Sequence, residues 1–248
     1  MKVLLTVLSG LLLSMACSDV NGEIVVFQDD YSDKRDGSDV LAQRSPRVGA
    51  SYSGEGRLYV PGAQTEGSAA LAAAAFEKKG FVHAPGATAN GLRWNLGDDA
   101  SAKTIRQFVE IAFSFYMVGG TGANGMSVMT FLDNEGTKNR SFTLALKDNG
   151  IMSWYDGYFH QVGERSPINE VVSFYARLDL AAGTFTAKVG PVSFEGNLVS
   201  DSHNDFFYDP SEAEHAAEVT LGNVIFITST PVEFFLSDPR VSVIPRLP

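Results

Sequence analysis

Large apolar residues recur at every second position in several short runs of this chain. From Phe142 to Leu146 the alternate residues are Phe, Leu and Leu, and the run from Phe174 to Leu180 follows the same rhythm, with Ala176 as its one small member. Successive side chains of an extended strand point to opposite faces, so a period of two places the apolar residues on one side. The pattern predicts strands that each bury one face of a sheet.

Turn residues between these runs favour antiparallel pairing. Asn149-Gly150 and Asp156-Gly157 separate consecutive runs, and both pairs readily adopt the positive φ of a tight hairpin. Ala181 to Gly183 provides a third turn, so we expect three successive hairpins that form a meander. The helical candidates are Ser68–Lys79, which is rich in alanine with Gly80 as its C-cap, and Ser211–Ala217.

The candidate strands are short and spread along the chain, which is typical of a sandwich or a barrel. They are Ile24–Phe27, Arg57–Val60, Gly91–Asn95, Gln107–Val118, Ser127–Leu132, Ser141–Lys147, Ile151–Tyr155, Tyr158–Val162, Val171–Leu180, Thr184–Val189, Val192–Glu195, Glu218–Thr228 and Glu233–Val243. No repeat of fixed period and no linker-like segment interrupts them. We therefore expect one all-β domain with one or two short helices.

The first residues have the pattern of an export signal. Lys2 precedes a short apolar run, Val3 to Leu13, that is too brief to span a bilayer, and Ser14 to Ala16 offers a small-x-small cleavage site. We expect residues 1–16 to be a signal peptide, 17–23 a tether and 24–248 the domain. Cys17 follows the cleavage site, as in the bacterial lipoprotein signal that this segment resembles, so it is the candidate for lipidation. Ordinary cleavage that leaves an incidental cysteine is the alternative.

Composition excludes several classes of partner and site. The chain has 29 acidic and 19 basic side chains among 248 residues, a net charge of −10, which disfavours binding to a nucleic-acid backbone. A single cysteine excludes a disulfide scaffold and a metal site built from cysteines. After the signal segment, no apolar run is long enough to cross a membrane, so we expect contact with a membrane only through a lipid on Cys17.

Three segments carry a resemblance to a known fold. The hairpin from Asn149 to Gly163, the first strand with Asp29 and Asp30, and the closing strand around Asp238 are similar to those of the concanavalin A-like, or laminin G-like, jelly roll. The resemblance implies an antiparallel two-sheet β-sandwich over residues 24–248. Because this fold hosts lectins, glycanases, lyases and adhesion modules, it does not assign a function.

Aromatic residues around Asp156-Gly157, and one tryptophan in an earlier strand, are candidates for sugar binding. A sugar packs its apolar face on an aromatic ring, while amides and carboxylates hydrogen-bond to its hydroxyls. Ordinary filling of the sandwich core is the alternative for the same rings. The candidate ligand-binding residues are Trp94, Trp154, Tyr155, Tyr158, His160 and Gln161.

The sequence offers little for catalysis. A retaining glycosidase needs two carboxylates about 5 Å apart, whereas Glu110 stands alone in a strand where alternation points it to solvent. Tyr158 and His160 fall on one face of their predicted strand, as a polysaccharide lyase of this fold would use a Tyr/His pair. The Arg-rich strand and the Gln-x-His strand of those lyases are absent.

The resemblance also implies a structural Ca²⁺ between the first and last strands, held by hard oxygen ligands. Asp29, Asp30 and Asp238 occupy the matching positions, and Asp33 belongs to an acidic loop nearby. A solvated acidic loop is the alternative, and Pro239 departs from the acidic or amide residue that the family usually has there.

These observations favour an exported, non-catalytic binding or adhesion module whose partner is an extracellular glycan. A polysaccharide lyase or glycoside hydrolase on the same fold is one alternative, and a structural cell-envelope protein without a small ligand is another. A catalytic protein requires an acid/base pair within hydrogen-bond reach of one sugar site. A purely structural one requires Trp94, Trp154 and Tyr158 all to be buried.

Overall fold

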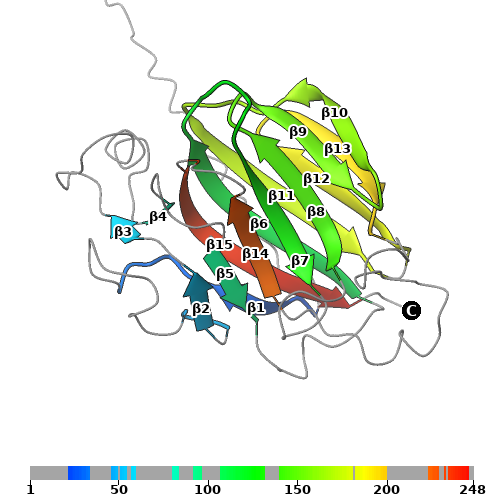
Figure 1. Ribbon diagram of the computed structural model, residues 1–248. Helices are drawn as coiled ribbons and strands as arrows, with labels where there is room; N and C mark the ends of the chain where they lie inside the picture. Colours follow the sequence, from blue (N-terminus) through cyan, green and yellow to red (C-terminus); the bar gives the residue numbers. More distant parts are fainter. Residues whose placement is uncertain are drawn as a thin grey trace, which may run out of the picture.

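The computed structural model describes residues 22–33, 46–49, 51–54, 57–59, 80–83, 92–96, 107–131, 140–180, 182–199, 223–228, 232 and 234–245. These residues form two sheets that lie face to face as a β-sandwich (Figure 1). Every strand pairing among them is antiparallel. The predicted all-β, two-sheet antiparallel sandwich is therefore confirmed.

The larger sheet has eight strands. They are β1 (Ile24–Gln28), β3 (Arg57–Tyr59), β4 (Gly80–His83), β6 (Gln107–Met117), β11 (Val171–Asp179), β12 (Thr184–Val189), β13 (Val192–Asn197) and β15 (Phe234–Pro245). Their order is β13-β12-β11-β6-β15-β4-β3, and β1 also pairs with β15. The first and last described strands are thus neighbours, as the resemblance implied.

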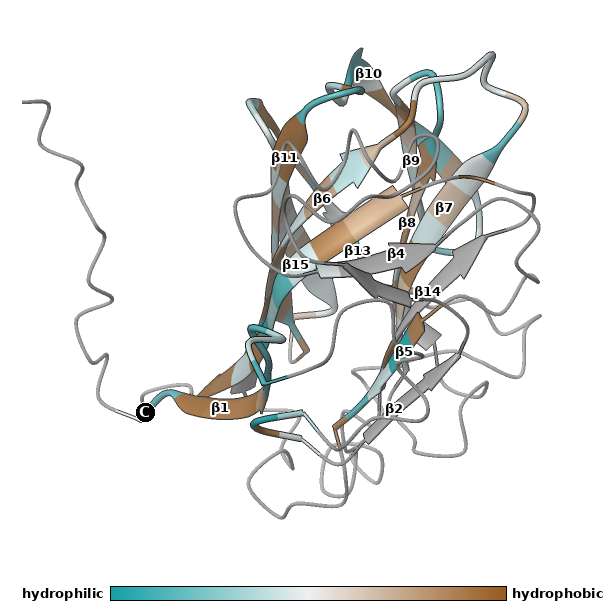
Figure 2. Cartoon of the chain, turned by 90° about the vertical axis from the view of Figure 1, so that its left-hand side faces the viewer, coloured by the Kyte–Doolittle hydropathy of each residue, from teal (hydrophilic) through white to brown (hydrophobic). Residues whose placement is uncertain are grey.

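The smaller sheet has seven strands. They are β2 (Ser51–Gly54), β5 (Leu92–Asn95), β7 (Gly125–Phe131), β8 (Arg140–Lys147), β9 (Ile151–Tyr155), β10 (Phe159–Arg165) and β14 (Asn223–Thr228). Their order is β10-β9-β8-β7-β14-β5-β2. Seen edge-on, the two sheets form separate layers, with hydrophobic bands in the strands of both (Figure 2).

The predicted meander of three hairpins is wrong in one respect. The hairpins β8–β9 and β9–β10 form in the smaller sheet, but the chain then crosses to the larger sheet before β11. Pro167 lies in the connection and has no N–H to donate to a ladder. Asn169 in the same connection has a φ of 58°, and its side chain accepts a 2.8 Å hydrogen bond from the Gly119 N–H. The third hairpin, β11–β12, therefore lies in the opposite layer.

Aromatic rings fill the space between the sheets. Phe113 of β6 stacks on Phe174 of β11 with 4.4 Å between ring centroids, and it meets the edge of Trp94 from β5 at 5.9 Å. On β11 the side chains at 172, 174, 176 and 178 are buried, whereas those between them face outward. The period of two thus sets the inner face of each sheet, as the sequence predicted.

Gly80, predicted to cap a helix, instead begins β4. A Cβ at this position would lie 2.2 Å from the Phe235 ring, so only glycine lets the two strands approach this closely. The two predicted helices, Ser68–Lys79 and Ser211–Ala217, lie outside the described residues, as does Cys17. Within the described ranges, no helix has the length and apolar character that a membrane crossing requires.

Candidate functional site

The β9–β10 hairpin brings together five of the six predicted ligand-binding residues. Its turn forms because Gly157 takes a φ of 131°, a region that L-residues rarely occupy. Asp156 closes the turn: its N–H donates to the Tyr158 carbonyl, and its Oδ1 accepts from the Tyr158 N–H, both at 3.3 Å. The Asp-Gly pair thus fixes the tip on which the aromatic residues sit.

Two rings at this tip are largely exposed. Tyr158 is 80% exposed and Phe159 is 67% exposed. Phe159 lies opposite Tyr155 in the β9–β10 ladder, with 5.0 Å between their ring centroids, and Gln161 follows on the same face of β10. This outer face of the hairpin therefore presents aromatic rings next to an amide.

The inner face of the hairpin holds a compact group of three side chains. His160 lies opposite Trp154 and stacks on its indole with 4.0 Å between ring centroids and 16° between planes. The His160 Nε2 lies 2.9 Å from the Asp156 Oδ1. Trp154 is partly buried and also packs edge-to-face with Phe185 of β12, with 5.6 Å between ring centroids. Trp154 therefore supports the hairpin, because His160 and Phe185 already occupy much of its surface.

Trp94, the sixth predicted ligand-binding residue, is a core residue, and the prediction that it contacts a sugar is wrong. Its side chain is 0% exposed and stacks on Phe27 of β1 with 5.2 Å between ring centroids. In β5 it shares the buried face with Leu92, whereas Arg93 and Asn95 are less buried. The alternation of residues in β5 could by itself have predicted that the Trp94 side chain lies in the core.

The expected pairing of Tyr158 with His160 on one strand face is also wrong. Tyr158 lies in the turn before β10 begins, so strand alternation does not determine its direction. His160 faces Trp154 and is held by Asp156. For these two residues, the shared strand face on which the lyase hypothesis depended is therefore not formed.

The sequence context indicated that Glu110 stands alone. In the structure its side chain belongs to a cluster on the outer face of the larger sheet. Its Oε1 accepts a 2.7 Å hydrogen bond from the Tyr175 hydroxyl and lies 3.6 Å from Arg177 Nη1. Burial and the Glu110 carboxylate together raise the pKa of Tyr175 above its ordinary value. The sequence could not indicate this cluster, because it depends on the register of β6 against β11.

The three predicted calcium ligands lie near one another where β1 pairs with β15. Two of them form hydrogen bonds with backbone groups or an ion pair. Asp29 is buried; its N–H donates to the Pro239 carbonyl and its Oδ1 accepts from the Tyr31 N–H. Asp30 forms a 3.1 Å ion pair with Arg47, and Asp238 has a φ of 51° at the bulge of β15. Among the described residues, no three acidic, His or Cys side chains form a group suited to a metal. Calcium stays a prediction.

Comparisons with known proteins give matches in structure only. No protein-family model and no curated protein matches the sequence. The chain is similar to a carbohydrate esterase from the Shiga toxin-encoding bacteriophage phi24B, with a TM-score of 0.53 and 14% identity, covering 91% of this chain and 100% of the esterase. It is also similar to the binding domain of botulinum neurotoxin DC in complex with SialylT, with a TM-score of 0.50 and 6% identity, covering 88% of this chain and 47% of that one. At these identities the likeness shows the β-sandwich fold alone.

Proposed function

We propose that this protein is an exported glycan-binding module that holds an extracellular carbohydrate at the tip of the β9–β10 hairpin. The exposure of two adjacent rings, 80% for Tyr158 and 67% for Phe159, carries the proposal. Neighbouring aromatic side chains that a fold leaves in water mark a contact surface for a ligand or partner. Aromatic rings next to polar groups are suited to a sugar, whose apolar face stacks while its hydroxyls hydrogen-bond.

Each side of the hairpin has its own part in this proposal. Tyr158 and Phe159 stack on the sugar, and Gln161 hydrogen-bonds to its hydroxyls from the face that it shares with Phe159. His160, Asp156 and Trp154 position the tip, because their mutual contacts hold the turn against Phe185. The exposure of Tyr158 also argues against a purely structural role, which required this ring to be buried.

Similar structures and the sequence supply the wider setting. One similar structure is a carbohydrate esterase, and the other is a toxin's binding domain in complex with SialylT, so proteins of this shape include ones named for carbohydrate chemistry. We extend the proposal to a concanavalin A-like sandwich that leaves the cytoplasm through the signal in residues 1–16. Lipidation of Cys17 would then hold it at the cell envelope.

A glycan array tests the proposal. The Cys17→Ser chain would be compared with variants that also carry Tyr158→Ala or Phe159→Ala, and with Val171→Ala as a control. Val171 is 43% exposed on β11, away from the hairpin, and matches the loss of an exposed apolar side chain. We expect each hairpin variant to lose about tenfold or more in affinity, roughly 1.4 kcal/mol, while the control stays unchanged. Equal binding by all four proteins would reject the site.

Two further arms address calcium and catalysis. A chelator should abolish binding if calcium organises the β1–β15 region and the ligand site depends on it; unchanged binding would remove calcium from the proposal. Chromatography of each bound glycan before and after incubation detects turnover. Cleaved product would favour the lyase or hydrolase alternative over a binding module.

A further inference from the structure

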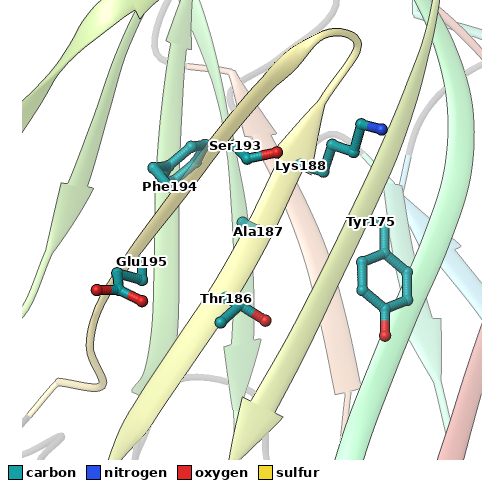
Figure 3. Close-up of a pocket in the computed structure, with 7 residues that line it drawn as sticks. All are labelled: Tyr175, Thr186, Ala187, Lys188, Ser193, Phe194 and Glu195. Carbon is teal, nitrogen blue, oxygen red and sulfur yellow. The ribbon is translucent and has the colours of Figure 1, made fainter.

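A shallow hollow lies on the outer face of the larger sheet, over β11, β12 and β13. Its volume is about 440 Å³, within the range of roughly 300–1,000 Å³ found for small-molecule sites. The side chains that face it from the three strands are Tyr175, Thr186, Lys188, Ser193 and Glu195 (Figure 3). On β12, Thr186 and Lys188 alternate with the buried Phe185, Ala187 and Val189, so the hollow and the core lie on opposite faces of this strand.

The register places these residues in two rows across the strands. Tyr175 pairs with Lys188, and Lys188 pairs with Ser193. In the next row Arg177 pairs with Thr186, which pairs with Glu195. The hollow therefore has an aromatic ring on one side, hydroxyl groups in each row, and one charge of each sign.

The ring of Tyr175 is held in place from the side away from the hollow. Its hydroxyl donates to Glu110, and Arg177 lies 3.6 Å from the same Glu110 oxygen. The Arg177 guanidinium in turn sits over the Phe108 ring, 4.1 Å from its centroid. A ring fixed before the ligand arrives loses less conformational entropy on binding.

The two charges at the hollow are available to a ligand. Lys188 and Glu195 occupy diagonal positions on neighbouring strands, where Cα atoms lie about 7–8 Å apart. Within the described ranges, neither forms an ion pair with the other or with a third residue. Both side chains are exposed, so an ammonium donor and a carboxylate acceptor flank the ring.

We propose that this hollow is a second glycan site, and that it takes an uncharged sugar residue of a polysaccharide. The sugar stacks on Tyr175, its hydroxyls donate to Glu195 and accept from Lys188, and Thr186 and Ser193 add hydrogen bonds. A polyanion would meet Glu195 in a chain of net charge −10. A polycation would meet Lys188. The inference rests on the proposed function and adds to it the charge class of the ligand.

The hollow and the hairpin are separate sites. Trp154, on the inner side of the hairpin, packs against Phe185, which points into the core from β12. A Cβ at Gly196 would lie 2.8 Å from the Trp154 indole, so β13 also backs onto the hairpin's inner side. The hollow lies on the outer face of the same two strands, and each site can be removed without touching the other.

The test uses five hexasaccharide probes: the uncharged cellohexaose, mannohexaose and N-acetylchitohexaose, the anionic hexagalacturonate and the cationic glucosamine hexamer. Amide chemical shifts of the Cys17→Ser chain would be followed during titration, with and without Tyr158→Ala and Phe159→Ala. We expect an uncharged probe to shift the amides of residues 175, 186 and 188 even when both hairpin rings are absent. We expect neither charged probe to do so.

Matched variants then identify the contacts. Lys188→Gln and Glu195→Gln should each weaken binding at the hollow by about tenfold, and Tyr175→Phe, which keeps the ring but removes its hydrogen bond to Glu110, should weaken it less than either. Thr184→Ala, an exposed position on β12 outside the hollow, is the control. Shifts confined to residues 155–161 would overturn this inference and leave the proposed function standing. Binding of either charged probe at residues 175–188 would overturn the charge assignment. An absence of shifts at these residues with all five probes would overturn this inference, and the glycan array decides the proposed function separately.

Discussion

The indole of Trp94 lies flat against the ring of Phe27, with 5.2 Å between ring centroids and 13° between planes. The two residues come from different sheets, so their contact joins the layers at the first described strand. Neither side chain is exposed to solvent. This stack is part of the sandwich core.

We therefore expect Trp94→Ala to destabilise the fold by about 3–5 kcal/mol, the usual cost of deleting a buried large aromatic side chain. Urea denaturation measures the change. Tyr158→Ala serves as the comparison, because that exposed ring should contribute less than about 0.5 kcal/mol. Similar losses for both variants would contradict the assignment of one ring to the core and the other to the surface.

The loop between β6 and β7 depends on a glycine that faces a buried carboxylate. A Cβ at Gly120 would lie 2.1 Å from the Asp148 Oδ2, and Asp148 is held by the Gly122 N–H. Gly120→Ala should cost about 1–3 kcal/mol, because the added Cβ would clash with the buried Asp148 carboxylate. Gly163→Ala is the matched control, since nothing lies within 4 Å of its added Cβ. A thermal melt should separate the two, and equal melting temperatures would rule out this close packing.

The stack of His160 on Trp154 predicts a fluorescence change. His160→Ala removes the ring that covers one face of the indole, so acrylamide should quench Trp154 more efficiently. The only other tryptophan, Trp94, is fully buried and contributes a constant background. Adding Trp154→Phe should abolish the increase. If quenching does not rise in His160→Ala, the two rings are not in contact in solution.

Asp30 predicts a small acid dependence of stability. Partial burial opposes its charged form, but hydrogen bonds from Ser32 and the Arg47 guanidinium outweigh burial and hold the pKa of Asp30 below its ordinary value. A carboxyl group with a lowered folded-state pKa stabilises the fold above its unfolded-state pKa, and this contribution fades as the pH falls through the folded-state value. Asp30→Asn should therefore cost up to about 1 kcal/mol at neutral pH, because the pair is exposed, and nothing in strongly acidic solution.

Urea denaturation at a series of pH values checks this expectation. Arg47→Gln should remove part of the same contribution, because it deletes the cation of the ion pair. A difference between Asp30→Asn and the native chain that persists undiminished in acid would show that the amide disturbs packing and that charge is not the cause.

The sequence predicts those elements that are determined by neighbouring residues, and it fails for those that are determined by pairing with distant strands. The strands between residues 107 and 197 follow from alternation and turn residues, and their observed bounds agree with the predicted ones to within a few residues at each end. The short strands β2 and β4 were not predicted. At four residues each, β2 and β4 are too short for a period of two to be evident, and their pairing with neighbouring strands decides them.

The residues of the candidate sites also differ in whether local sequence could predict their positions. Tyr158 and Phe159 follow an Asp-Gly turn, and their position at a hairpin tip could be predicted from that turn alone. The contact between Glu110 and Tyr175 spans 65 residues and requires the register of two strands, which no local pattern contains. The hollow around Lys188 depends on two registers at once, that of β11 against β12 and that of β12 against β13.

The pairing of β1 with β15 also determines which side of the protein would face a membrane to which Cys17 is attached. In the sheet order, β1 lies five inter-strand spacings from β13, about 24 Å across the larger sheet. β10 contacts β13 at that far edge, so the hairpin belongs to the same side of the molecule as the hollow. If the chain is attached to a membrane through Cys17, which precedes β1 in the sequence, both proposed sugar sites would therefore lie on the side remote from the attachment.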